Sequence, residues 1–210
     1  MTVATERMLY AEYGRSLIIR PADGEDTDLF FDEICEQFDN KKIEQDSEGN
    51  VYIIAPTGGE SSDQNSEITL QLRLWAKQDG RGRALDSNAL FILPDGSKRS
   101  PDGSWVSNEK IRALCKANRL KFLRLVPEFV IELKSPSDKL LELKRKMEEW
   151  MRHGVQLGWL IDPAKRQVFV YSKGVPEVAV LADVAIIVAG EPVNGFLLDL
   201  EPIWSSLADL

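Results

Sequence analysis

Apolar residues recur at helical spacing in separate parts of the chain, each bounded by residues that start or stop a helix. The first part, residues 26–39, begins with acidic residues, and the second, residues 65–80, ends at a glycine. In the third part, Ser137 or Asp138 caps a long helix that runs to about His153. We therefore expect these three segments to be the main helices.

Runs typical of strands fill the intervals between these helices. Residues 41–56 predict a hairpin with its turn at residues 47–50, because a Gly-Asn pair interrupts two strand-forming runs. A loop is expected at residues 57–64 and another at 94–100, and Ser107 caps a short helix that ends near residue 115. The other predicted strands are residues 83–86, 89–93, 104–106, 128–135, 155–163 and 166–174, followed by one or two edge strands near the end.

The order of these elements predicts an α/β (α+β) fold in which helices cover a central mixed sheet. A chain of 210 residues that is 43% hydrophobic can bury one full core, so we expect a single domain over residues 1–210. Within it, residues 1–25 form an N-terminal extension, residues 26–175 the core, and residues 176–210 the C-terminal edge strands and tail.

Charge and composition narrow the classes of function. A formal net charge of −8 argues against a protein that coats nucleic acid with a broad basic surface, although local basic patches remain compatible with it. The two cysteines, Cys35 and Cys115, lack the spacing of a disulfide framework or a zinc site. No apolar run approaches the roughly 18 residues of a membrane span, and no signal peptide is recognised, so we expect a cytoplasmic protein.

An unusual pair of charges stands in the apolar run "EFVIELKSPSD". Glu132 and Lys134 are two residues apart on a predicted strand, so their side chains share a face of the sheet. Charges in such a place are paired or bind an ion, because an isolated buried charge is costly. The pair alone fits either a structural ion pair at the end of a strand or part of a functional site.

Asp102 in "SPDGSWV" favours the functional interpretation. It introduces an apolar strand, and if this strand lies beside the Glu132 strand, both carboxylates face one spot. Carboxylate oxygens at that density suit Mg²⁺ or Mn²⁺. Lys134 then lies beside the metal, where its ammonium can orient a water molecule and offset the charge of a phosphate.

At this point the sequence resembles the Uma-type restriction endonuclease family, within the PD-(D/E)XK nuclease superfamily. The superfamily signature is a proline-aspartate pair, then Glu-x-Lys on a later strand, then a long helix. The phrases that carry the resemblance are "PTGGE" (56–60), "SPDGSWV" (100–106), "VPEFVIELKSPSD" (126–138) and "MRHGVQLGWLIDPAKRQVFVY" (151–171). Their order and spacing, over most of residues 25–175, make the match fairly specific.

The resemblance implies a restriction-endonuclease-like core and Mg²⁺- or Mn²⁺-dependent hydrolysis of DNA phosphodiesters. It implies that Asp102 and Glu132 are metal ligands and that Lys134 is the catalytic lysine. The superfamily often adds an acid from the first core helix, for which Glu67 is the nearest candidate and Glu60 a competitor. Gly103, directly after Asp102, departs from the apolar residue expected there and can loosen the backbone at a ligand position.

Further expectations concern partners and alternatives. A cleft that contains Lys134, Lys139, Lys144 and Arg145 would give DNA a local positive field. The resemblance also implies a homodimer, because nucleases of this superfamily pair two sites to cut two strands. Each of these charges also fits a solvated helix face.

His153 fits a role at the helix C-terminus, and Gln156 fits a surface amide or a residue that reaches the site. The alternative function is a non-catalytic binding or regulatory protein of the same fold, in which the charged pair only stabilises the sheet.

Overall fold

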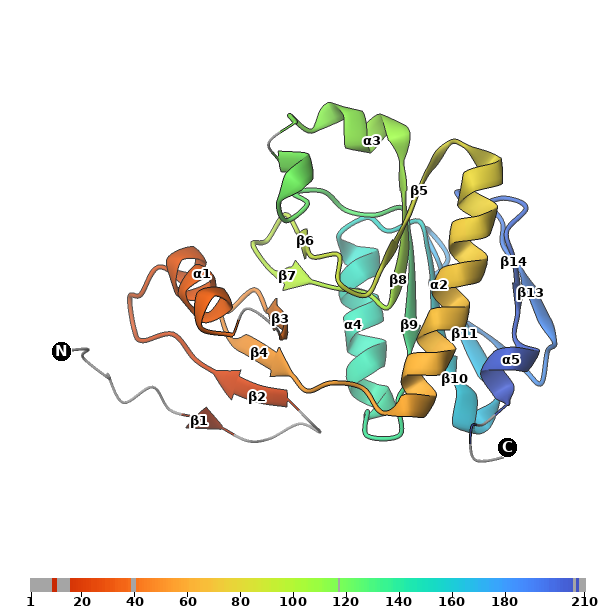
Figure 1. The fold of residues 1–210 in the computed structure, drawn as a ribbon, viewed down its shortest axis with the longest axis horizontal. Coiled ribbons are helices and arrows are strands. Elements are labelled where there is room, and N and C mark those ends of the chain that lie inside the picture. The colour runs from red at the N-terminus through yellow and green to blue at the C-terminus, as the bar shows by residue number, and fades with distance from the viewer. Residues whose placement is uncertain (1–8, 11–15, 39–40, 117, 206, 208–210) are drawn as a thin grey trace.

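A computed structural model describes residues 9–10, 16–38, 41–116, 118–205 and 207, and the statements below concern these residues (Figure 1). Its helices are α1 (Thr27–Gln37), α2 (Gly59–Asp79), α3 (Asn108–Ala113), α4 (Leu140–Arg152) and α5 (Glu201–Trp204), with 3-10 turns η1 (Asn118–Leu120) and η2 (Pro163–Lys165). Its strands are β1 (Leu9–Tyr10), β2 (Ser16–Ile19), β3 (Lys42–Gln45), β4 (Val51–Ile54), β5 (Gly82–Asp86), β6 (Phe91–Ile92), β7 (Lys98–Arg99), β8 (Gly103–Ser107), β9 (Phe129–Leu133), β10 (Leu157–Asp162), β11 (Gln167–Ser172), β12 (Ala179–Ala182), β13 (Ile186–Val188) and β14 (Leu197–Asp199).

A six-stranded central sheet organises the larger part of the molecule. Its strand order is β12-β11-β10-β9-β8-β5. β9 and β10 are parallel and the other neighbours antiparallel, so the sheet is mixed. Figure 1 shows α2 and α4 covering opposite faces of this sheet. The predicted fold class, a mixed sheet flanked by helices, is confirmed.

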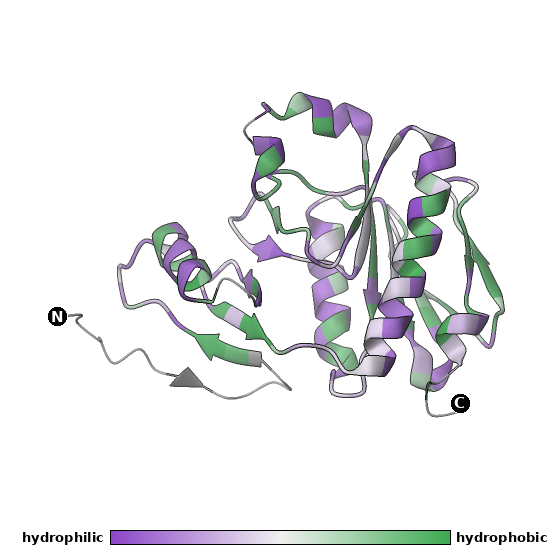
Figure 2. Ribbon diagram, in the orientation of Figure 1, coloured by the Kyte–Doolittle hydropathy of each residue, from purple (hydrophilic) through white to green (hydrophobic). Residues whose placement is uncertain are grey.

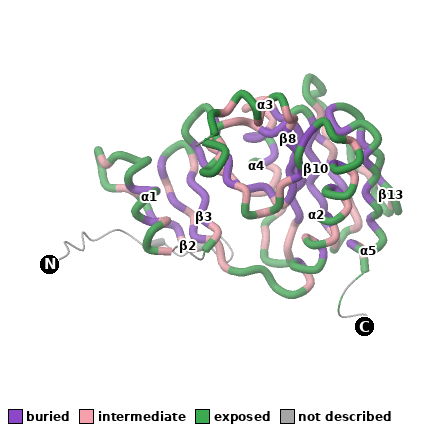
Figure 3. The backbone as a smooth tube through the Cα atoms, turned by 45° about the horizontal axis from the view of Figure 1, so that its top comes forward, coloured by how far each residue is buried: buried purple, intermediate pink, exposed green. Residues whose placement is uncertain are grey.

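Successive side chains of β9 point to opposite faces of the central sheet, so the strand contributes to two apolar clusters, one under each helix. Val130 packs with Met147 and Trp150 on the α4 face, while Ile131 packs with Ile68 of α2 on the other face. Every residue of β9 is buried, as expected for a strand covered on both sides. Figure 3 shows the buried strands β8 and β10 between these two helices. Glu132, on the Val130 face, therefore points toward α4.

A second six-stranded sheet, of order β1-β2-β4-β3-β7-β6, lies at the N-terminal end and is covered by α1. It has its own apolar cluster, which includes Phe30, Phe31 and Val51. Figure 2 shows the hydrophobic colour over most of β2 and β4. β6 and β7 come from the chain segment between β5 and β8, so they tie this sheet to the central one.

Several predicted boundaries were wrong. α2 begins at Gly59 rather than residue 65, because its first turns carry the serines and acids that also favour a loop. The predicted loop 94–100 contains the short strand β7. Ser107 does cap α3 by accepting from the Lys110 amide, but the helix ends at Ala113.

The described residues near both ends of the chain contain further secondary structure. β12 is an edge strand, as predicted, but β13, β14 and α5 pack over the α2 side of the central sheet and bury Phe196, Leu198 and Ile203. In the predicted extension 1–25, residues 16–19 form β2, and residues 1–8 and 11–15 lie outside the described part of the chain. Within that part, none of the helices has the length and apolar composition of a membrane span.

Candidate active site

The structure brings Asp102 and Glu132 together at the start of β8. Gly103 pairs with Ile131 in the antiparallel ladder, so the preceding Asp102 stands opposite Glu132. Asp102 Oδ2 accepts a hydrogen bond of 2.8 Å from the Leu133 amide. Gly103 does not interrupt the strand, because β8 pairs with β5 on one side and β9 on the other.

Glu132 is almost completely buried, with 2% of its surface exposed. Its Oε1 lies 3.0 Å from Lys146 Nζ and accepts a 2.9 Å hydrogen bond from Trp150 Nε1. Burial raises the pKa of this carboxyl to about 7, and the neighbouring acids Asp102 and Glu44 act in the same direction, against the ammonium of Lys146. Burial therefore disfavours the charged form of Glu132 more than Lys146 favours it.

Glu44 of β3 brings a third carboxylate from the N-terminal sheet. It is 4% exposed, and its Oε1 lies 3.0 Å from Lys146 Nζ and accepts from the Ser100 amide. Burial alone would raise its pKa, but the positive charges of Lys146, Lys42 and Arg99 outweigh this effect and lower the pKa to about 2. Glu44 is therefore a carboxylate at neutral pH.

Lys146 of α4 lies between two of these carboxylates, with Glu44 on one side and Glu132 on the other. It also donates to the Ser100 carbonyl oxygen at 3.1 Å. Burial acts to lower the pKa of Lys146, but Glu132, Glu44 and Asp102 together raise it, so the ammonium form persists. A second lysine, Lys42, lies 3.5 Å from Asp102 Oδ1.

A groove of about 1000 Å³ opens beside these charges. Its walls are the first half of α2, the loop between β4 and α2, the loop after β5 and the loop between β9 and α4. The acids that line it are Glu44, Glu60, Asp86, Asp102, Glu132 and Asp138, and the bases are Lys41, Lys42, Arg73 and Lys146. The groove thus carries an excess of negative charge and favours cations.

Of the other predicted site residues, Lys134 and Glu67 lie outside the lining of the groove, and Glu60 is part of it. Lys134 Nζ donates to the Ser135 carbonyl oxygen at 3.2 Å, and Lys134 is not among the residues that line the groove. Glu67 Oε1 accepts a hydrogen bond from Gln71 Nε2. Gln71 in turn exchanges two hydrogen bonds with the backbone of Asp199 in β14, so this face of α2 lies against the C-terminal segment of the chain. Glu60 does line the groove.

The remaining basic candidates lie outside the groove lining as well. Lys144 Nζ lies 4.3 Å from the centre of the Phe169 ring, and Arg145 is largely exposed beside Glu142. Lys139 is also absent from the lining. Gln156 is an exposed residue ahead of β10, which fits the expectation of a surface amide.

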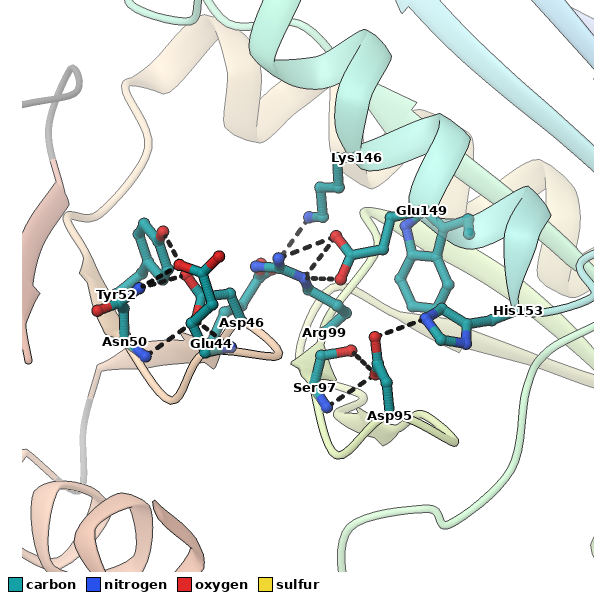
Figure 4. Close-up of polar contacts among 12 residues, drawn as sticks. Glu44, Asp46, Asn50, Tyr52, Asp95, Ser97, Arg99, Lys146, Glu149 and His153 are labelled. Atoms are coloured by element: carbon teal, nitrogen blue, oxygen red, sulfur yellow. Dashed lines mark hydrogen bonds and ion pairs between the residues drawn. The ribbon is translucent and has the colours of Figure 1, made fainter. Parts of the chain in front are cut away.

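A neighbouring cluster of Asp95, Glu149 and His153 has ligand atoms close enough to hold a metal. These groups already have partners: Asp95 accepts from His153 and Ser97, and Glu149 accepts two hydrogen bonds from Arg99 (Figure 4). Figure 4 also shows Lys146 and Arg99 extending toward Glu44. The cluster joins the β6–β7 turn to α4, and His153 is the C-cap of that helix.

Comparison with known proteins places the chain in a family. Residues 30–201 match the Uma2 family, described as "Putative restriction endonuclease". The chain belongs to this family. No curated protein matches the chain. The Uma2 assignment agrees with the resemblance seen in the sequence phrases around Asp102 and Glu132.

A solved structure shows the same fold. It is described as "a putative nuclease belonging to DUF820 from Anabaena variabilis", and the two chains superpose with a TM-score of 0.67 at 22% sequence identity. The match covers 78% of this Uma2 chain and 90% of that chain. At this identity the likeness concerns the fold.

Proposed function

We propose that this Uma2 protein is a Mg²⁺- or Mn²⁺-dependent endonuclease that hydrolyses DNA phosphodiesters. The observation that carries the proposal is the cluster of Glu44, Asp102 and Glu132 around Lys146 at the edge of the groove. Family membership and the nuclease-like fold support the same class of activity.

The donor set fits a hard divalent cation. Such ions prefer carboxylate oxygens, and here Asp102, Glu132 and Glu44 offer them without a competing soft ligand. The pKa of Glu132 is raised first by burial, and Asp102 and Glu44 add to this effect against Lys146, so a bound cation would favour the carboxylate form of Glu132. A bound cation would supply positive charge beside the scissile phosphate and make a water molecule there a better nucleophile.

The lysines supply the remaining chemistry. Lys146 and Lys42 form ion pairs with Glu132 and Asp102, and their ammonium groups would also stabilise the negative charge of a phosphate in the groove. In the proposed reaction, the water oxygen bonds to phosphorus and the water loses a proton, one ester P–O bond breaks, and the leaving oxygen takes up a proton. Lys146, which lines the groove, is better placed than Lys134 to stabilise the negative charge on the phosphate and on the leaving oxygen.

The test is nicking of supercoiled plasmid with Mg²⁺ or Mn²⁺ and its reversal by a chelator. We expect Glu132→Gln and Asp102→Asn to lower the rate on the order of 100-fold, since even outer partners of metal ligands cost 10- to 100-fold. Asp63→Asn changes an exposed acid on α2 outside the groove lining and should leave the rate unchanged. Comparing Lys146→Met with Lys134→Met, at a temperature at which both variants are folded, tests which lysine is catalytic, and Glu67→Gln tests the weaker candidate acid.

One observation favours the alternative of a non-catalytic protein of this fold. Lys146 already satisfies Glu44 and Glu132 by direct ion pairs, as a purely structural network would. If no plasmid is nicked under any metal condition and Glu132→Gln changes only the melting temperature, that alternative replaces the nuclease. The homodimer and the cytoplasmic location stay predictions.

A further inference from the structure

The first turn of α2 lies on the wall of the groove with its backbone amides uncapped. The N-cap residue Gly58 provides no side-chain hydrogen bond, and the first amide to bond within the helix is that of Ser62, to the Gly58 carbonyl. The amides of residues 59–61 therefore have no partner in the helix. α2 is 21 residues long, so its dipole places a substantial partial positive charge at this end.

Two polar side chains beside these amides also lack partners. Ser61 is only 4% exposed, and its hydroxyl makes no hydrogen bond to any described residue. The amide oxygen of Asn65 is buried without a partner, and its nitrogen has none among the described residues either. Ser61 and Asn65 are one helical turn apart, and both line the groove. The Ser61 hydroxyl and the Asn65 amide nitrogen can donate hydrogen bonds to acceptor atoms of a ligand in the groove, whereas the buried Asn65 oxygen is an acceptor and calls for a donor such as water.

A second helix begins at the same groove. The loop 135–138, which leads into α4, forms part of its lining, and the α4 N-cap residue Lys139 provides no side-chain cap. Figure 1 shows α2 and α4 starting at the same edge of the central sheet and running in similar directions. Two positive helix ends thus flank the groove, and helix N-termini favour phosphate and other anions.

We infer that the first turn of α2, with Ser61 and Asn65, binds a backbone phosphate of a nucleic-acid strand, next to the phosphate that faces the carboxylates. This inference rests on the proposed function. The groove wall of α2 extends from Gly59 to Arg73, about 21 Å at 1.5 Å per residue, which is longer than a single nucleotide needs. Arg73 supplies a further positive charge along the same wall.

Glu60 opposes the bound phosphate from within this first turn. It lines the groove beside the free amides, and its carboxylate repels an anion there. Replacing it with a neutral side chain of the same shape should therefore strengthen binding, whereas a new acid at position 65 should weaken it. A groove wall that does not contact a phosphate would not change the affinity in these two opposite directions.

The experiment measures binding of a short fluorescein-labelled DNA duplex by fluorescence anisotropy, with Ca²⁺ in place of Mg²⁺ so that binding is measured without cleavage. We expect Asn65→Asp to weaken binding about tenfold and Ser61→Ala to weaken it a few-fold, whereas Glu60→Gln should strengthen it a few-fold. In Asn65→Asp, the dependence of log affinity on log salt concentration should be shallower by about one phosphate contact. Lys77→Gln, an equal charge change on the exposed side of α2, should bind as wild type. Unchanged melting temperatures show that the variants are folded.

Wild-type affinity in Asn65→Asp and Ser61→Ala would overturn the inference and leave the nuclease proposal standing, provided that the wild-type protein binds and cuts DNA. A wild-type protein that neither binds nor cuts DNA would overturn both. A free mononucleotide that competes as well as the duplex would overturn the assignment to a strand, because the site would then recognise a single phosphate group.

Discussion

Lys146 supplies the positive charge that Glu44 and Glu132 share in the absence of metal. We predict that Lys146→Met lowers the free energy of unfolding by about 3 kcal/mol, because removing one partner leaves buried carboxylates uncompensated. Urea denaturation measures this change. Mg²⁺ should raise the melting temperature of the variant more than that of the wild type, since the ion restores the missing charge.

Arg145→Met is the matched control, on the residue before Lys146 in α4. Arg145 is 67% exposed on its side chain, so its loss should change the unfolding free energy by less than about 0.5 kcal/mol. Equal stability of both variants, with no added effect of Mg²⁺ on Lys146→Met, would contradict an electrostatic role for Lys146.

The sequence allowed one half of this charge cluster to be predicted. Asp102 and Glu132 stand out because each interrupts or introduces an apolar strand. Glu44 alternates with Ile43 in a short hairpin strand, which is also the pattern of a solvated face, and only docking of the two sheets buries it. Lys146 left a weaker signal: it is four residues before Trp150, on the apolar side of its helix, where a lysine needs a partner.

At the scale of elements, β5 pairs with β8 because the backbone of Gly82 can lie close to Trp105 and Val106 of β8. A Cβ added there would overlap the Trp105 ring and the Val106 carbonyl oxygen, so we predict that Gly82→Ala lowers stability by about 1–3 kcal/mol. Thermal and urea denaturation check this. Gly103→Ala, on the neighbouring strand, places its methyl 3.5 Å from Ile68 at ordinary contact distance and should be nearly neutral. A similar loss in both variants would show that the Trp105 contact is not the cause.

Element types were more predictable than their ends. The period of apolar residues identifies α4, β9 and β10 because these elements bury a continuous face. The start of α2 could not be placed, since its first turn is a groove wall of serines and glycines whose composition is that of a loop. β6 and β7 have two residues each and are held by pairing with distant segments, so they leave no local pattern.

For the whole molecule, the net charge of −8 and the acidic groove predict that DNA binding requires a divalent cation. We expect the affinity for the labelled duplex to be on the order of tenfold higher in Ca²⁺ than in EDTA at matched ionic strength, because a site-bound ion offsets the carboxylates, which diffuse Na⁺ only screens. Anisotropy titrations measure it. Equal affinity in both buffers would indicate that DNA binds away from the carboxylates.

The overall architecture was within reach of sequence reasoning, since a succession of strands and helices with buried strands predicts a covered mixed sheet. The second sheet was not, because its strands come from residues 9–54 and 91–99 and pair across the chain. Long-range pairing of this kind depends on which faces are left to bury after the local elements form.

The charge cluster draws on positions 42 to 146 and on both sheets. During synthesis, Glu44 and Asp102 leave the ribosome before the amine of Lys146 exists to join them. A nascent or prematurely terminated chain that lacks α4 therefore carries an incomplete set of groups. We therefore expect the proposed cutting activity to require α4, and a chain that ends before Leu140 to show none.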